Sequence, residues 1–459
     1  MKKNIRLALL CVPYLLIVIV SLPTLIIGFD SETINYTHNF VFEHRSPNLF
    51  ADLANGVQLP SIISKSFRPL YYISFCLDFI VFDANVLWYR LENLLWLLLT
   101  LTLLLRFADK LGLQLWTKLI VGIFFALHPA HGFMMVYIYS RTDLMVAVFI
   151  LAILDNFASL GQRASPGRQY YFALALMVIS IFWKENLIVI PALLLLGDRA
   201  LGWTKGNWKR RALIHLPFWL IAIISLIMQS IITKNLGYTV TYDQVTQIHL
   251  GIVDQMAVFS NYLLAIHYWD IPYLGCVVLF IMLIIGPGWR SRLLILATLI
   301  VLIPYLLVWC SEMHVFVASL GISLWAGAFI EDVLKIKYRS VAILILITLG
   351  LGLGVSWGML YGFKFNGFIR QANKLNRIIE YVVEKYPNPQ SDTRFIFPDD
   401  ADVFDHGDKI KVLSRLNLTL QVAYRREDIF ILPQKLENYK NSGNGQNKLS
   451  IHIPAYILK

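Results

Sequence analysis

Long apolar runs recur along this 459-residue chain and are separated by short polar segments, which restricts the fold more than any other feature. A helix needs about 20 predominantly apolar residues to cross a bilayer, and its backbone polar groups must be satisfied within the membrane. The composition agrees, because 57% of the residues are hydrophobic and 15% are charged. Soluble domains carry about 25% charged residues. The sequence therefore predicts an all-α polytopic membrane protein.

Basic residues set the expected orientation of these runs. The formal charge is +11, and the basic residues cluster in short loops between apolar runs. This distribution is typical of the cytoplasmic loops of a membrane protein and does not indicate nucleic-acid binding. Lys2, Lys3 and Arg6 place the amino terminus inside. The apolar run that follows is too long for a signal-peptide core, so it is predicted to stay as a span. About eleven spans satisfy the charge rule, at about residues 7–29, 86–106, 117–128, 142–160, 169–183, 187–201, 212–233, 272–287, 293–310, 315–332 and 340–362.

The chain is expected to divide into two domains. Residues 1–363 form the transmembrane domain, in which residues 30–84 are a long outer loop with interfacial helices, one of them running from Arg68-Pro69 toward Phe82. Residues 364–459 form a small extracytoplasmic α/β domain. In that tail, residues 365–386 have the spacing of an amphipathic helix. Strands are expected at residues 394–398, 418–423 and 449–453.

Ionisable residues gather at the outer membrane face under this topology. Charged groups are costly in hydrocarbon, so ionisable residues in and beside membrane spans are candidates for a functional site. Each one alone is explained equally well as a helix cap or an interfacial anchor, and it is their joint occurrence on one face that indicates a site. These candidates are Asp30, Glu32, Arg68, His128, His131, Arg141, Asp143, Lys184, Glu185, Glu312 and His314.

Asp30 and Glu32 directly follow the first predicted span. Either carboxylate could be a general base that deprotonates an acceptor hydroxyl or amine. They could instead hold a divalent cation, or Asp30 could simply cap a helix. No other cofactor is predicted, and the four cysteines have no spacing typical of zinc ligands or of a disulfide framework.

Lys184 could bind a phosphate group, with its ammonium held in place by the neighbouring Glu185 carboxylate. The alternative is a plain interfacial ion pair, worth under about 1 kcal/mol. Arg68, before Pro69, could bind a phosphate bidentately or anchor the interfacial helix.

Two further pairs have alternative explanations. His128 and His131 favour phosphate or sugar contacts over metal ligation, because Pro129 breaks the helical phase between them. Arg141 and Asp143 could pair with each other.

Four segments occur in an order typical of a known family: Arg68-Pro69-Leu70 before an apolar helix, Phe125-Ala126-Leu127-His128-Pro129-Ala130-His131, Ser140-Arg141-Thr142-Asp143-Leu144, and Lys184-Glu185. Together they resemble the polytopic C-type (GT-C fold) glycosyltransferases. The nearest branch contains the protein O-mannosyltransferases, their tetratricopeptide-bearing relatives, and bacterial lipid A aminoarabinose transferase-like proteins. Glu312-Met313-His314, with Ser319-Leu320-Gly321 after it, is similar to the Glu-Arg-Tyr-Leu-Tyr-Leu-Pro-Ser-Leu-Gly stretch of that branch. The resemblance covers residues 10–335.

The resemblance implies inverting transfer of a sugar from a polyprenyl-phosphate donor, at the extracytoplasmic face of a membrane such as the bacterial inner membrane. The family's catalytic acid follows the first span, where Asp30 matches and Glu32 is the alternative. Met313 and Val315 replace the family's usual Arg and Leu, and the tail has no tetratricopeptide signature. The expected partners are the donor and membrane lipid, with no nucleic acid. The sequence does not identify the acceptor or the sugar.

The residues implied to bind the donor phosphate are Arg68, His128, His131, Lys184 and Glu185.

Two other functions fit part of the pattern. A lipid or solute transporter would carry inverted repeats and mid-membrane charges, whereas here no such repeat is found and the charges lie at one face. A polysaccharide polymerase or ligase would use a lipid-diphosphate donor at a similar site.

Overall fold

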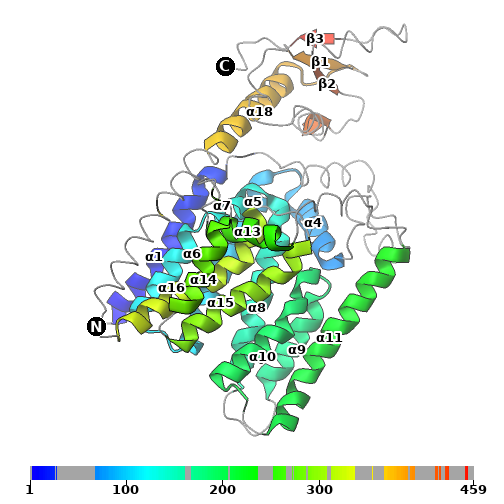
Figure 1. Ribbon diagram of the computed structural model, residues 1–459. Coiled ribbons are helices and arrows are strands. Elements are labelled where there is room, and N and C mark those ends of the chain that lie inside the picture. Colours follow the sequence, from blue (N-terminus) through cyan, green and yellow to red (C-terminus); the bar gives the residue numbers. More distant parts are fainter. Residues whose placement is uncertain are drawn as a thin grey trace.

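A computed structural model shows a bundle of helices with a smaller helix-and-sheet unit beyond one end of it (Figure 1). The residues it describes are 3–25, 27, 68–160, 167–204, 207–235, 252–264, 271, 273–285, 288–307, 312–335, 354, 366–390, 393–397, 419–421, 423–424, 430–433 and 450–452. The helices of the bundle are α1 (Lys3–Ser21), α4 (Pro69–Phe82), α5 (Val86–Lys110), α6 (Leu115–Leu127), α7 (Ala130–Val136), α8 (Arg141–Ala158), α9 (Arg168–Ser180), α10 (Ile190–Leu201), α11 (Trp208–Asn235), α13 (Ile252–Leu263), α14 (Leu274–Ile285), α15 (Trp289–Leu302) and α16 (Phe316–Val333).

Helices α8 and α16 form the centre of the bundle. Almost every described side chain of α8 is buried, and 83% of the most apolar part of α16 is buried. Helix α11 lies at the edge of the bundle in Figure 1, and only 22% of its most apolar part is buried, so its apolar surface suits contact with lipid. The core is therefore built from predominantly apolar helices that are buried on nearly every side.

Glycines in α16 allow its close packing against two neighbours. A Cβ atom at Gly321 would lie 2.1 Å from Thr298 Oγ1 of α15, and one at Gly327 would lie 2.4 Å from Val121 Cγ2 of α6. In membranes, where lipid removes much of the hydrophobic drive for helix association, small residues permit this close approach. The sequence of α16 thus fixes it between α6 and α15.

Membrane crossing is supported by length and composition for part of the bundle. Among the described residues, α5, α11 and α16 are long and apolar enough to span, and α6 with α7 forms a fourth candidate bent by 48°. The bend falls at His128-Pro129, where proline disfavours helical geometry in the preceding residue. Helices α4 and α14 and residues 8–24 form shorter apolar helices. The count of eleven spans stays a prediction, and its last member, residues 340–362, lies outside the described residues except for residue 354.

The tail contains α18 (Asn366–Lys385) and the strands β1 (Arg394–Phe397), β2 (Phe430–Pro433) and β3 (Ser450–His452). The sheet order is β2-β1-β3, with both pairs parallel. Helix α18, β1 and β3 lie where a helix and strands were expected. The strand expected at residues 418–423 is wrong, because residues 419–421 and 423–424 are helical. There Leu420 is buried, and the Tyr424 hydroxyl donates to the carbonyls of Val382 and Tyr386 at the end of α18.

The predicted boundary between residues 363 and 364, and an extracytoplasmic domain at residues 364–459, stay predictions. Figure 1 places α18 and the sheet beyond the end of the bundle at which α1 ends and where α4 and α7 lie. Under the predicted topology, that end is the outer one.

Candidate functional site

The first turn of α8 separates two polar clusters. Arg141 and Asp143 are two residues apart, so their side chains leave the helix on different sides. Asp143 contacts the segment around Lys184, whereas Arg141 contacts α4 and α5. The expectation that Arg141 and Asp143 pair with each other is therefore wrong, and each has its own partners.

The Lys184 cluster comprises Arg68, Asp143, Lys184, Glu185, Tyr305 and His314. Lys184 Nζ donates to Asp143 Oδ1 at 2.7 Å, and the Tyr305 hydroxyl donates to the same oxygen at 2.6 Å. The side chains of Lys184 and Asp143 are 7% and 2% exposed, so this ion pair lies in the interior. The ring of His314 lies 5.5 Å from that of Tyr305. The cluster thus joins α8, the loop after α9 and the segment after α15.

Arg68 and Glu185 form the more open half of the same cluster. Arg68 Nε donates to Glu185 Oε2 at 2.8 Å, and Nη2 donates to Oε1, which is the bidentate geometry that guanidinium and carboxylate favour. Their side chains are 23% and 37% exposed. Burial opposes the charge of Glu185, but Arg68 and then Lys184 outweigh it and lower the pKa of this carboxyl to about 2. The pair is therefore ionised at neutral pH.

Backbone geometry explains why the adjacent residues Lys184 and Glu185 have different partners. Lys184 precedes the 3₁₀ helix Glu185–Val189 and has an extended backbone, with φ −159° and ψ 140°. In extended backbone, successive side chains point to opposite sides. The cation of Lys184 is held by Asp143, and not by the neighbouring Glu185 as expected. The Leu70 amide also donates to the Phe182 carbonyl at 3.1 Å, which ties the start of α4, beside Arg68, to this segment.

His128 and His131 lie in the protein interior at the bend between α6 and α7. His128 Nδ1 accepts from the Ala130 amide at 3.2 Å, and Nε2 lies 2.8 Å from the Leu263 carbonyl, which fits a neutral ring that carries its proton on Nε2. The ring of His131 packs 4.0 Å from that of Phe125. His128 therefore ties the bend to the end of α13, and His131 packs within the bend. The expected role of both histidines at a phosphate stays a prediction.

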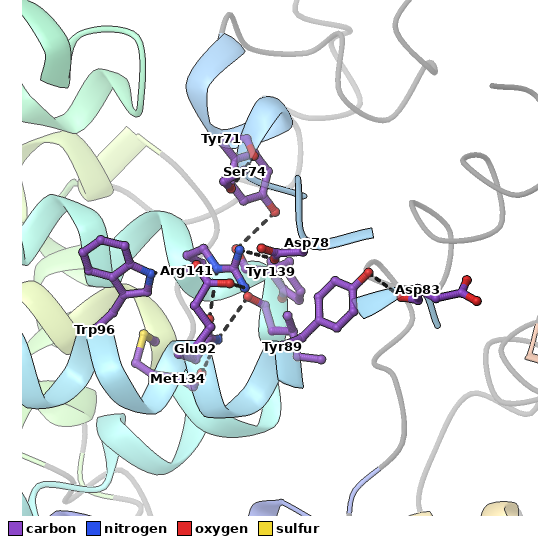
Figure 2. Close-up of polar contacts among 12 residues, drawn as sticks. Tyr71, Ser74, Asp78, Asp83, Tyr89, Glu92, Trp96, Met134, Tyr139 and Arg141 are labelled. Carbon is purple, nitrogen blue, oxygen red and sulfur yellow. Dashed lines mark hydrogen bonds and ion pairs between the residues drawn. The ribbon is translucent and has the colours of Figure 1, made fainter. Parts of the chain in front are cut away.

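The Arg141 cluster lies between α4, α5 and α8 (Figure 2). Arg141 is fully buried, and its Nη1 pairs with Asp78 Oδ2 while its Nη2 lies 3.2 Å from Glu92 Oε2. Its Nε donates to Asn93 Oδ1 at 3.1 Å, and its guanidinium carbon lies 4.8 Å above the Phe75 ring. Two carboxylates thus share one guanidinium. Burial raises the pKa of Asp78 to about 7 against the attraction of Arg141, and Glu92 raises it further.

Helix α5 also holds the end of the first helical segment through Arg90, which is fully buried. Its Nε donates to the Ile27 carbonyl at 2.9 Å, and its Nη1 donates to the Val136 carbonyl at 3.1 Å and to that of Met135. Ile27 is three residues before Asp30. Arg90 therefore fixes the point from which the first outer loop departs.

Three of the predicted site residues cannot be placed by their side chains. Asp30 and Glu32 fall within residues 28–67, which lie outside the described residues, and Glu312 is described only as the start of a 3₁₀ helix. Among the described residues, no group of three His, Cys, Asp or Glu side chains is arranged to hold a metal ion. The general base and the divalent cation both stay predictions.

Sequence reasoning missed five residues of these clusters: Asp78, Arg90, Glu92, Asn93 and Tyr305. The sequence indicates four of them, because ionisable and amide side chains inside or beside apolar runs are candidates for a functional site. Asp78 lies within an apolar stretch, and the other three fall near the start of a predicted span. Tyr305 gives no comparable signal, because tyrosine is common at membrane interfaces.

A narrow apolar cavity lies between α8, α10, α15 and α16. Its lining includes Ile150, Leu193, Val301 and Val317, and its cavity volume is about 70 Å³. Val301 is one helical turn before Tyr305 along the chain. The cavity and the Lys184 cluster therefore share α8 and the α15 segment, and the part of the cavity nearest to the cluster along the chain is lined by Val301.

Comparisons with known proteins locate the fold. No protein-family model and no curated protein sequence matches the chain. Among solved structures, the chain is similar to ArnT from Cupriavidus metallidurans bound to undecaprenyl phosphate, at 12% identity and a TM-score of 0.50, over 100% of this chain and 94% of that one. It is also similar to apo ArnT from the same organism, at 14% identity and a TM-score of 0.47, over 96% and 92%.

A third similar structure is the apo oligosaccharyltransferase of Archaeoglobus fulgidus, at 11% identity and a TM-score of 0.46, over 94% of this chain and 64% of that one. At these identities the likeness shows the fold alone, and it rests on the first structure, which aligns over the whole chain. The chain has the fold of the C-type membrane glycosyltransferases, the GT-C fold.

Proposed function

We propose that this protein is a membrane glycosyltransferase that moves a hexose or pentose from a polyprenyl-phosphate donor to an acceptor at the extracytoplasmic face, with Asp30 as the general base. The observation that carries the proposal is the Lys184 cluster, which places the partly exposed Arg68 close to the segment that carries the buried Lys184. A polyprenyl phosphate suits such a pair of cations, because its anionic head must lie at the interface while its chain stays in hydrocarbon. The ArnT structure of the same fold was solved with undecaprenyl phosphate, which supports this class of donor.

Arg68 and Lys184 are the groups proposed to meet the donor phosphate. A guanidinium has five N–H donors, and Glu185 takes two of those of Arg68, so the partly exposed Arg68 can bind an anion while its ion pair persists. Lys184 has three donors, and Asp143 accepts from this ammonium. Both cations would stabilise the charge that develops on the phosphate as the glycosidic bond breaks.

The acceptor proton is proposed to go to Asp30, with Glu32 as the alternative base. Inverting transfer needs the base on the sugar face opposite the leaving phosphate. The Arg90 contact to Ile27 supports such a placement, because it starts the first outer loop next to α5 and α7. A divalent cation held by Asp30 and Glu32 is a second role for the same carboxylates.

The test is transfer of labelled sugar by the purified full-length protein from a panel of polyprenyl-phosphate sugars, with water, glycolipid and peptide acceptors. Wild type is compared with Asp30→Asn, Glu32→Gln and the control Asp109→Asn, which changes an exposed carboxylate at the other end of α5. We expect turnover by wild type and the control, and a loss of at least about 100-fold in Asp30→Asn. Normal turnover by both Asp30→Asn and Glu32→Gln would remove the proposed base.

The same assay separates the alternatives. A panel of lipid-diphosphate sugars tests a polymerase or ligase, and uptake of labelled lipid into vesicles tests a transporter. Chelation of divalent ions in a parallel sample tests the cation. Turnover with diphosphate donors alone would replace the proposed donor class.

A further inference from the structure

A groove with a volume of about 570 Å³ lies on the α4–α5 side of the Arg141 cluster. Its walls are apolar and come from one face of each helix, with Leu77 and Val81 on α4 and Trp88 and Leu95 on α5. Each of these side chains is about half exposed or more. Volumes of this size are typical of sites for small organic ligands.

The floor of the groove is acidic. Asp78 and Glu92 both line it and both pair with the single guanidinium of Arg141. Two carboxyl groups against one cation leave the floor with an excess of hydrogen-bond acceptors. Glu92 also accepts from Trp96 Nε1 at 3.0 Å, yet its side chain remains 24% exposed, so it can accept further bonds from a ligand. The floor therefore suits a group that donates hydrogen bonds, and it offers no accessible cation to an anionic head group, because Arg141 is fully buried behind the two carboxyl groups.

The groove adjoins the elements that the proposed reaction uses. From a single turn, helix α8 places Arg141 behind the carboxyl groups that line this groove and Asp143 in the Lys184 cluster. Arg90, two residues before Glu92, holds the Ile27 carbonyl at the start of the loop that carries Asp30. A ligand head bound at Glu92 would thus lie near the origin of the predicted base, across α8 from the predicted donor phosphate.

We propose that the groove between α4 and α5 binds the acceptor, and that the acceptor is an amphiphile with a hydroxyl-rich head and an apolar chain. The head donates hydrogen bonds to Glu92 and Asp78 and lies against the exposed indole of Trp88. The chain follows Leu77, Val81 and Leu95 into the bilayer. The ligand's role as the acceptor rests on the proposed function, whereas the binding of an amphiphile in the groove does not.

The test uses photoreactive probes with the purified full chain in phosphatidylcholine nanodiscs. One probe is a diazirine-bearing dodecyl maltoside, and its matched control is a diazirine-bearing dodecyl sulfate of the same chain length. We expect the maltoside to label peptides of α4 and α5 and the sulfate not to label them. Equal labelling by both probes, or maltoside labelling elsewhere, would show ordinary lipid contact and overturn the proposal.

Three variants sharpen the result. Glu92→Gln should lower maltoside labelling by about tenfold, since the ligand then donates to a neutral amide oxygen in place of a charged carboxylate. Leu95→Trp should abolish labelling because it fills the groove, whereas Leu99→Trp, an exposed position one turn further along α5, should leave it unchanged. Unchanged labelling of Leu95→Trp would refute the site even if Glu92→Gln fails to fold.

Two measurements distinguish an error in the proposed binding groove from an error in the proposed glycosyltransferase function. Slow hydrolysis of a polyprenyl-phosphate sugar by the wild-type protein, measured without either probe, tests the donor reaction alone. Hydrolysis without maltoside labelling overturns the groove and keeps the function. Maltoside labelling without hydrolysis keeps the groove as a glycolipid site and overturns its role as the acceptor site.

Discussion

At the scale of single residues, the interior of this protein contains charges whose partners come from distant parts of the chain. Lys184 and Asp143 are nearly fully buried and are joined by a 2.7 Å hydrogen bond. Taking two charges out of water is costly, so such a pair contributes little net stability while the loss of one partner is severe. This pair is therefore weak evidence for stability, and its role at the proposed donor site has to be tested separately from folding.

Lys184→Met separates these two effects. The substitution leaves the Asp143 carboxylate without its cation and should destabilise the protein by about 3–5 kcal/mol. In the double variant Lys184→Met/Asp143→Asn the buried charge is gone, so thermal stability in detergent should largely return while donor turnover stays low. The control Lys118→Met breaks a more exposed pair with Asp109 and should cost under about 1 kcal/mol. Turnover that returns together with stability would show that Lys184 is only structural.

Arg90→Lys tests the link between α5 and the first outer loop. Lysine keeps the charge but lacks the planar fork that reaches the Ile27 and Val136 carbonyls together. We expect donor turnover to fall by about tenfold or more, since a small displacement of a catalytic group is costly. Hydrogen exchange should rise in the peptide that contains Ile27. Arg106→Lys, at an exposed arginine near the other end of α5, is the control and should change neither; an equal loss there would point to a general effect of the substitution.

At the scale of helices, the sequence located elements better than it located partners. The helix from Pro69 to Phe82 and the bend at Pro129 follow from local chemistry, because proline acts on its own neighbours. The partners of Arg141 could not be predicted in this way, since α4 and α5 meet α8 only through tertiary packing. Residues 418–423 show the same limit, because a short apolar run fits a strand or a buried helix, and contact with α18 decided the outcome.

The stability of the folded protein should depend on pH through Asp78 of helix α4. Burial raises the pKa of Asp78 to about 7, above its ordinary value of 3.8, so the folded protein holds a proton that the unfolded chain has lost between these values. Stability should therefore fall as pH rises through this window, by on the order of 2 kcal/mol. Thermal unfolding at pH 5 and pH 8 should show this loss in wild type and in Asp109→Asn, but not in Asp78→Asn. Parallel profiles for all three proteins would contradict it.

The packing of α15 on α16 should depend on Gly321. In Gly321→Ala the new methyl group would meet Thr298 Oγ1, whose hydroxyl donates to the Leu294 carbonyl at 2.7 Å. Overpacking of this kind costs about 1–3 kcal/mol, so the thermal midpoint should fall. Adding Thr298→Ala should recover most of the loss, because it removes the opposing atom. If the double variant is no more stable than Gly321→Ala, the close approach is not the cause.

At the scale of the whole molecule, the proposal depends on which membrane face carries the Lys184 cluster. The charge rule places the amino terminus and the end of α5 inside, and Figure 1 places α18 at the opposite end of the bundle. Asp109, near the end of α5, and Glu384, near the end of α18, are both exposed. They therefore offer one reporter for each face.

Cysteine labelling decides the orientation. In a cysteine-free background expressed in bacterial cells, a membrane-impermeant maleimide should label Glu384→Cys in intact spheroplasts and label Asp109→Cys only after permeabilisation. Both variants replace exposed carboxylates near helix ends, so stability should change little and the labelling reports position. The reverse pattern would put Arg68, Lys184 and the α4–α5 groove at the cytoplasmic face. The donor head group would then have to be presented from the cytoplasm, and an extracytoplasmic transferase would be excluded.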